Sequence, residues 1–363
     1  MQAISPTTAQ VDAARRALHR KAVGIVIVVA ASYGWLVFGP QFVLTKIAAG
    51  LVLVVGLTAT ATSVFHDANH GSFSTSRFVN RVVGYSGDLL GGSSWIWRFK
   101  HNQLHHGNTN VVGFDADIEQ APFARLAPSQ TWRPWHRYQH LYMWGLYGFL
   151  TLQWLLISDF VDLARGGIGE HAFPRRPRRR DTFALFAGKV LHVGWALALP
   201  FAFHSWWIVV TVYVAVSWGV GLSLATMFQL AHCNDLVEFP GEAESRRGSD
   251  FMDHQLRTTV DVHARTRIGR RAQRWLMGGL DHQVEHHLAP GLPHTVYPIV
   301  AANLDSHCGD HAIAPLSHAT PWQAVRAHGR WLRFMGTNPT NCSAAVGTTS
   351  AFAASASASS TPL

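Results

Sequence analysis

Long apolar runs separated by short polar segments dominate the first two-thirds of the chain. The runs are Val23 to Phe38, Phe42 to Phe65, Leu141 to Val161, Phe183 to Phe203 and Trp206 to Leu230. A helix needs roughly 20 apolar residues to cross a bilayer, so each run is a candidate membrane span. The first run lacks a small-residue cleavage site and is soon followed by the second, which indicates a retained membrane segment and not a signal peptide.

The charges between the runs indicate which of them cross. Five crossings would place "FHDANH" (Phe65 to His70) and "HQVEHH" (His282 to His287) on opposite faces of the bilayer. The basic segments "ARRALHRK" (Ala14 to Lys21) and "RRPRRR" (Arg175 to Arg180) border apolar runs, and short loops rich in Lys and Arg stay cytoplasmic. We therefore predict four crossings.

In this arrangement runs one and two form one transmembrane hairpin, and runs four and five form a second. Run three is rich in Trp and Tyr, which favour headgroup depth, so we predict an interfacial helix there, with an ordinary fifth span as the alternative. The fold class is an all-α integral membrane protein with a cytoplasmic helical cap. Residues 1–22 form a cytoplasmic N-terminal segment, 23–335 the membrane domain, and 336–363 an Ala/Ser/Thr-rich tail expected to be disordered.

Composition agrees with a membrane location and argues against two other classes. Hydrophobic residues make up 48% of the chain, and the net charge of +9 could suggest nucleic acid. The positive charge lies in short clusters beside apolar runs, which fits contact with membrane lipid, so no nucleic-acid partner is expected. Cys233, Cys308 and Cys342 are too few and too scattered for a disulfide framework or a cysteine-ligated zinc site.

Histidine is the unusual residue: there are 22, against 21 Asp and Glu together. They gather in "HDANH" (His66 to His70), "HNQLHH" (His101 to His106), "AHCND" (Ala231 to Asp235) and "HQVEHH", all at the predicted cytoplasmic boundary. Residues four apart share a helix face, so His66 with His70, and His101 with His105, can each grip one metal. His106 and His287 point elsewhere, which suits a second ion. Imidazole without thiolate suits Fe, Zn or Cu.

The boxes HxxxH, HxxxHH and QxxHH resemble those of the membrane fatty acyl desaturase family, specifically its front-end or linoleoyl-CoA desaturase-like subgroup with Gln in the third box. Further matching segments are Phe99 to Glu119, Phe228 to Pro240, His254 to Thr259 and Gly278 to His294. The resemblance implies a non-haem centre of two Fe, O2 as co-substrate, and a long acyl chain held in an apolar tunnel. The loop charges in turn predict a multi-pass protein with its active site on the cytoplasmic face.

Carried over residue by residue, the resemblance implies eight metal ligands. They are His66, His70, His101, His105, His106, His232, His286 and His287. Gln283 stands where many relatives carry a ninth histidine, and His282 rivals it by spacing. Some relatives hold a water with an Asn one turn before the lone histidine; here Phe228 takes that position, with Gln229 the nearest polar residue. Gln283, Gln229 and Asp67 are expected to support the ligands.

The resemblance thus implies a desaturase that inserts a double bond into a fatty acyl thioester or acyl lipid. No HPGG segment of a fused cytochrome b5 is present, so a separate ferredoxin or cytochrome with its reductase is the expected electron donor, docking at Arg175 to Arg180 or Arg265 to Arg274. The alternatives are an acyl hydroxylase or acetylenase of the same family, a membrane zinc hydrolase, which needs about three His and an open water site, and a non-catalytic metal protein.

Overall fold

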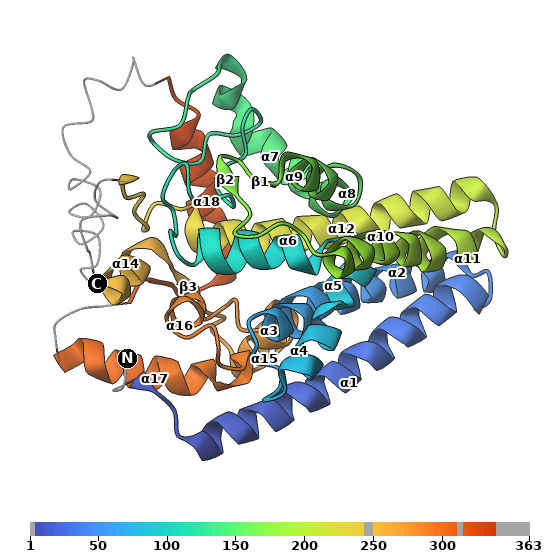
Figure 1. Cartoon of the computed structure of the whole chain (residues 1–363), viewed down its shortest axis with the longest axis horizontal. Helices are drawn as coiled ribbons and strands as arrows, with labels where there is room; N and C mark the ends of the chain where they lie inside the picture. The colour runs from blue at the N-terminus through green and yellow to red at the C-terminus, as the bar shows by residue number, and fades with distance from the viewer. Residues whose placement is uncertain (1–3, 243–249, 311–314, 339–363) are drawn as a thin grey trace.

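Four long apolar helices extend together from one end of the molecule (Figure 1). The computed structural model describes residues 4–242, 250–310 and 315–338. The four helices are α1 (Thr8–Phe38); α2 (Val43–Ala59) continued by the π-helical η2 (Thr60–Phe65) and α3 (His66–Asn69); α10 (Arg179–Val193) continued by η6 (Gly194–Ala198) and α11 (Leu199–Phe201); and α12 (Trp206–His232). Each of the four is long and apolar enough to cross a membrane. The four runs predicted to cross the membrane thus each form a helix of sufficient length, and their crossing stays a prediction.

The outer surfaces of these helices are apolar. Val26, Leu44, Leu51, Val190 and Val210 all have at least 40% of their surface exposed. Exposed apolar side chains over most of a helix length are costly in water and favourable in lipid. The chain is therefore a membrane protein.

The first helix begins well before the apolar run that predicts it. Thr7 caps it through Gln10, whose side chain accepts a hydrogen bond from the Thr7 backbone N–H at 2.8 Å. The basic segment Ala14 to Lys21 consequently lies inside α1. This half of α1 reaches the elements drawn in orange (Figure 1).

The third apolar run folds as a broken helix. It comprises η4 (Pro134–Tyr138), α7 (Gln139–Tyr147), α8 (Leu150–Gln153), η5 (Trp154–Ser158) and α9 (Asp159–Arg165). Its two parts are bent by 72°. Gly148 lies in the break, where a Cβ would come within 2.1 Å of the Trp218 side chain, so glycine lets α12 cross closely at the bend. A bent pair is compatible with a broken span as well as with an interfacial position.

The remaining elements are short and gather at the ends of α2 and α12 that carry histidines (Figure 1). They are α4 (Arg77–Gly84), α5 (Ser86–Leu89), α6 (Ser94–Phe99), π-helical η3 (Lys100–His105), α14 (Phe251–Thr258), α15 (Arg267–Met277), α16 (Gln283–Leu288), η7 (His294–Val296), α17 (Tyr297–Asp310) and α18 (Pro321–Met335). Strands β1 (Gly167–Ile168) and β2 (His171–Ala172) pair antiparallel, and β3 (Asp261–Val262) pairs parallel with β4 (Ser317–His318).

An apolar cluster fixes α16, which carries the third histidine box. Val284 and Leu288 pack with Val296 and Val300, and Ala14 of α1 joins the same cluster. Burying such side chains stabilises the contact by about 1.5–3 kcal/mol each. The third box is thereby held between α17 and the first helix. Of the tail predicted to be disordered, residues 339–363 lie outside the described residues.

Candidate metal centre

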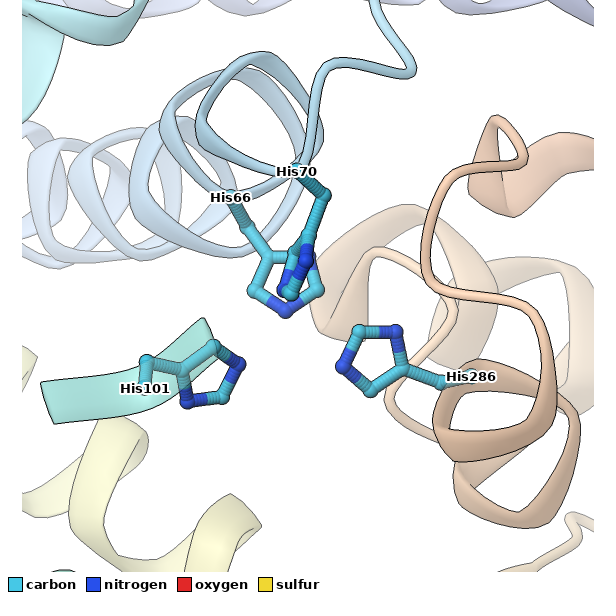
Figure 2. Close-up of side chains that lie close together, drawn as sticks. All are labelled: His66, His70, His101 and His286. Carbon is cyan, nitrogen blue, oxygen red and sulfur yellow. The ribbon is translucent and has the colours of Figure 1, made fainter. Parts of the chain in front are cut away.

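Four separate segments bring the predicted histidines together. His66 and His70 follow the second span, His101, His105 and His106 lie in and after η3, His232 ends α12, and α16 supplies His286 and His287. Figure 2 shows the rings of His66, His70, His101 and His286 converging from three of these segments. All eight are buried except His70, which is half-buried.

The eight side chains form overlapping groups whose ligating atoms lie within 4.8 Å of one another. The first group is His66, His70, His101 and His286, and the second is His105, His232 and His287. His106 lies with His286 and His287, between the two groups. His66 and His70 share a group, as their spacing predicts. His101 and His105 fall into different groups but also form a set of their own with Asp117.

The backbone of the second box is π-helical, and this changes which histidines align. The His106 N–H donates to the His101 carbonyl at 3.0 Å, an i→i+5 bond, and the Nε2 atoms of these two residues lie 3.2 Å apart. In an α-helix, residues five apart would not share a face. Single π-turns are frequent at functional sites. Here the π-turn allows neighbouring histidines to serve both groups.

The outer nitrogens of three histidines contact acceptor oxygens. His105 Nδ1 lies 3.1 and 3.0 Å from the carboxylate oxygens of Asp115. His287 Nδ1 lies 2.9 Å from Gln255 Oε1, and His286 Nδ1 lies 3.1 Å from the Tyr297 hydroxyl. A carboxylate or amide oxygen can only accept, so Nδ1 of His105 and His287 carries the hydrogen. The Nε2 lone pairs then face the groups.

Those inner nitrogens show whether the site suits a metal. The Nε2 atoms of His66, His70, His105, His286 and His287 are buried and have no hydrogen-bond partner within the described part of the chain. Leaving a buried polar atom unsatisfied costs about 1–3 kcal/mol. Five such atoms converging in one place are explained by metal ions that bind them. The donor set therefore fits a metal.

Burial and charge keep most of these rings neutral. Desolvation, followed by the neighbouring imidazoles, holds the pKa of His106, His286 and His287 well below the ordinary value. For His105 desolvation is outweighed by the carboxylate of Asp115, so its pKa is raised. Neutral imidazole is the form that binds a metal. The first three rings are ready to bind at neutral pH.

The predicted supporting residues lie in different places. Gln283 Nε2 is 2.9 Å from His232 Nε2, which puts Gln283 beside the second group. Gln229 is buried one turn before His232, and its Oε1 has no partner among the described residues. His282, the rival to Gln283, lies 3.2 Å from Asp281 and belongs to none of the metal-type groups found in the described residues. Asp67 contacts both His66 and His294.

Three residues that contact the histidines were not predicted from the sequence: Gln255, Tyr297 and Thr109. The Thr109 hydroxyl lies 3.1 Å from His287 Nδ1. Gln255 and Tyr297 are 32 and 11 residues from the histidines that they contact. No spacing rule connects such positions. The only signal was that Gln255 lies in the segment His254 to Thr259, one of the matches to the desaturase boxes.

A cavity of about 640 Å³ leads to the first group. Its lining runs from Val37 and Lys46, near the turn between α1 and α2, to His66 and Trp97. The Trp97 ring stacks on His101, with ring centroids 4.3 Å apart. An apolar molecule in this cavity would lie against the histidine site.

Apolar helices able to cross a membrane, a long cavity between them and a buried polyhistidine site define the class: a membrane protein with a metal-type site for an elongated apolar substrate. Comparison with known proteins gives the family. The family model described as fatty acid desaturase matches residues 43–319. The chain belongs to this family, and it is an oxidoreductase, a fatty acyl desaturase. The zinc hydrolase alternative is thereby set aside.

Individual relatives support the same conclusion. The chain is 31% identical over 323 residues to the sn-1 linoleoyl-lipid 6-desaturase of Arthrospira platensis, covering 89% of this chain and 86% of that protein. The protein of the same name from Synechocystis sp. is also 31% identical over 323 residues, covering 88% of each chain. The acyl-lipid (8-3)-desaturase of Physcomitrium patens is 33% identical, covering 84% of this chain and 64% of that protein.

Proposed function

We propose that this desaturase uses O2 and two histidine-bound irons to insert a double bond near the carboxyl end of a lipid-linked acyl chain. One observation supports this most: Nε2 atoms that have no partner among the described residues converge in two groups, and the first of these groups borders the long cavity. The names of the relatives, an sn-1 linoleoyl-lipid 6-desaturase and an acyl-lipid (8-3)-desaturase, supply the lipid carrier and the position.

Two ions are proposed because the histidines divide into two groups. His66, His70, His101 and His286 would hold one iron; His105, His232 and His287 would hold the other, with His106 at their boundary. Gln283 is a candidate to complete the second set. Oxidising an unactivated methylene demands a redox-active metal, which zinc is not. Iron together with O2 supplies that oxidising power.

The cavity indicates how the substrate lies. Lys46 and His66 are separated by 20 residues of continuous helix, or roughly 30 Å at 1.5 Å per residue. The methyl end of the chain extends from the histidines towards Lys46. The carboxyl end faces the other part of the lining, which includes Lys100 and Arg165. A double bond near the carboxyl end requires that only a short carboxyl-side segment of the acyl chain lie beyond the irons.

The protein's own groups orient the substrate and exclude water. The Trp97 ring lines the cavity and covers His101, so it presses one stretch of the acyl chain against the site. Asp115 and Gln255 keep the hydrogens of His105 and His287 on Nδ1. Holding reacting groups in fixed positions within a dry pocket is the protein's main contribution to such chemistry.

The reaction needs outside electrons. Two neighbouring carbons each lose one hydrogen, which gives a C=C bond, two electrons and two protons. O2 accepts these together with two electrons and two protons from outside and leaves as two waters. We propose a separate ferredoxin or cytochrome with its reductase as the donor. The basic surfaces of α15 and of Arg175 to Arg180 suit an acidic protein.

The proposed topology is four crossings in two hairpins, with the histidines on the cytoplasmic side and the third run in the interface. The histidine-bearing ends of α2 and α12 lie at the same end of the molecule (Figure 1). The basic loop before α10 supports a cytoplasmic assignment of that end.

The test is to express the chain with a ferredoxin and its reductase, and to locate double bonds in the host lipids by mass spectrometry. A His286→Ala variant at equal abundance is the control. A new unsaturated acyl lipid that depends on His286 supports the proposal, and a hydroxylated or acetylenic product would revise the outcome of the reaction. Unchanged lipids from a protein that carries zinc would contradict the proposal.

A further inference from the structure

The basic segment Ala14 to Lys21 does more than border the membrane. Its side chains bind backbone carbonyls of the histidine-bearing segments. Arg15 Nε donates to the Ser72 carbonyl at 3.4 Å, and His19 Nε2 lies 2.8 Å from the Phe73 carbonyl. Both carbonyls follow the first box directly. This half of α1 therefore packs against the metal centre and helps to hold the first box in place.

Within this segment, Lys21 is the residue whose contacts lead to the histidine site itself. Its Nζ lies 2.9 Å from the Arg274 carbonyl and 3.0 Å from His294 Nε2. His294 in turn contacts one oxygen of Asp67 twice: its Nδ1 lies at 2.9 Å and its backbone N–H donates at 3.0 Å. The other oxygen of Asp67 lies 3.5 Å from His66 Nδ1, an electrostatic contact and not a hydrogen bond, since this nitrogen has no hydrogen-bond partner within the described part of the chain. Lys21, His294 and Asp67 thus form a chain that ends at a member of the first group.

The hydrogens in this chain have only one consistent direction. A lysine ammonium can only donate, so His294 Nε2 accepts and His294 Nδ1 carries the hydrogen. That hydrogen goes to Asp67, whose carboxylate can only accept. The free oxygen of Asp67 then faces Nδ1 of His66 and favours a hydrogen there, leaving the Nε2 lone pair for the group.

The direction of these hydrogen bonds affects His66 because the residues that make them are buried. His66, Asp67 and His294 are each less than 5% exposed, so water cannot replace a lost partner. Without Lys21, the buried Nε2 of His294 loses the donor that lies 3.0 Å away, which costs free energy and loosens the ring. A displaced His294 would no longer hold Asp67 in place against His66.

We propose that Lys21 is a positioning residue for the metal centre, setting through His294 and Asp67 the tautomer of His66 that binds metal. The inference rests on the proposed function, because it assumes that His66 binds iron. The inference gives α1 a role in holding the first iron, although α1 contributes no histidine to the groups.

The test compares iron retention in the full-length protein against a competing chelator. Lys21→Met should weaken retention by about tenfold, the lower end of effects from groups that support ligands. Thr295→Val is the matched control: its hydroxyl donates to the Ala14 carbonyl at 2.7 Å, so it ties the same segment to α1 without touching Asp67. Its iron retention should equal that of the unmodified protein.

A second variant separates positioning from packing. His294→Asn keeps an N–H donor for Asp67 but has no ring tautomer to set, so Lys21→Met should have little further effect in that background. An equal effect in both backgrounds, loss of iron from Thr295→Val, or unchanged retention in Lys21→Met would each overturn the inference. If Lys21→Met does not fold, His294→Phe keeps a ring but removes the two nitrogens that connect Lys21 to Asp67, and normal retention in that folded variant would overturn the inference equally.

Failure of the proposed function looks different. In that case the unmodified protein itself would hold no iron, whatever residue occupies position 21. Iron in the unmodified protein with unaltered retention in the Lys21 variants would contradict only the inference.

Discussion

His105 Nδ1 lies 3.0 Å from a carboxylate oxygen of Asp115, a residue with no exposed surface. The contact fixes the ring hydrogen on Nδ1 and points Nε2 towards His232 and His287. Asp115→Asn lets the ring choose either tautomer, so we expect iron retention in the second group to fall about 10- to 100-fold. Iron content after dialysis against a chelator measures the loss. Asp253→Asn, the same change at an exposed carboxylate, should keep its iron; equal retention in both variants would contradict the role of Asp115.

Tyr297 supports the first group in a comparable way. Its hydroxyl lies 3.1 Å from His286 Nδ1, and only 1% of the residue is exposed. Tyr297→Phe keeps the ring but leaves Nδ1 buried without a partner, which costs about 1–3 kcal/mol of unfolding free energy. We expect lower thermal stability and lower iron content together. Tyr138→Phe at an exposed ring is the control, and normal iron in a Tyr297→Phe protein would remove Tyr297 from the support of His286.

Hydropathy predicted the long apolar helices, and histidine spacing predicted that His66 and His70 lie together, because both signals are local in sequence. The full set of eight histidines came from the resemblance to the desaturase family, since no spacing rule connects His232 to the others. The half of α1 before Val23 was not predicted as helix, since its charges interrupt the apolar pattern. The π-turn at His101 was not predicted either, because its i→i+5 bond leaves no periodic trace in six residues. Asp67 and His294 are 227 residues apart. Only the folded chain shows that they meet.

The far end of the cavity should limit the length of the acyl chain that the protein accepts. Val209 lines it and is 5% exposed, whereas the next residue, Val210, is 40% exposed on the outer face of α12. Val209→Trp fills the cavity, so we expect products to shift towards shorter acyl chains by several-fold in relative yield. Val210→Trp adds the same bulk outside the cavity and should leave the product profile unchanged. Lipid mass spectrometry compares the two, and identical profiles would place the acyl chain elsewhere.

Docking of an acidic electron donor should depend on exposed arginines. Arg270 and Arg271 lie exposed on α15, and Arg179 and Arg180 lie exposed at the start of α10. Each of these two arginine pairs can be changed to Gln in turn. For the pair that binds the donor, the change should raise the donor concentration needed for half-maximal turnover several-fold at low salt. The difference should shrink near 1 M salt, where screening acts within about 3 Å. A pair whose replacement changes nothing at low salt is not a docking site.

Asp88 gives the fold a pH dependence that is independent of the metal. Desolvation raises its pKa from 3.8 to about 7, against the opposing hydrogen bond from Ser94 and the charge of Arg98. A raised pKa means that the folded protein holds a proton that the unfolded chain releases. The contribution of Asp88 to stability is therefore fully present below pH 3.8 and is lost as pH rises through about 7.

Asp88→Asn removes this titration, and an amide oxygen can still accept the Ser94 N–H that lies 3.2 Å from Asp88 Oδ2. We expect the variant to be more stable than the unmodified protein at pH 8, by a few degrees in melting temperature, because it buries no charge there. The advantage should decline as pH falls towards 4, where Asp88 is protonated. Asp253→Asn should show no such trend. A difference between Asp88→Asn and the unmodified protein that stays constant from pH 8 to pH 4 would mean that Asp88 does not titrate in this range.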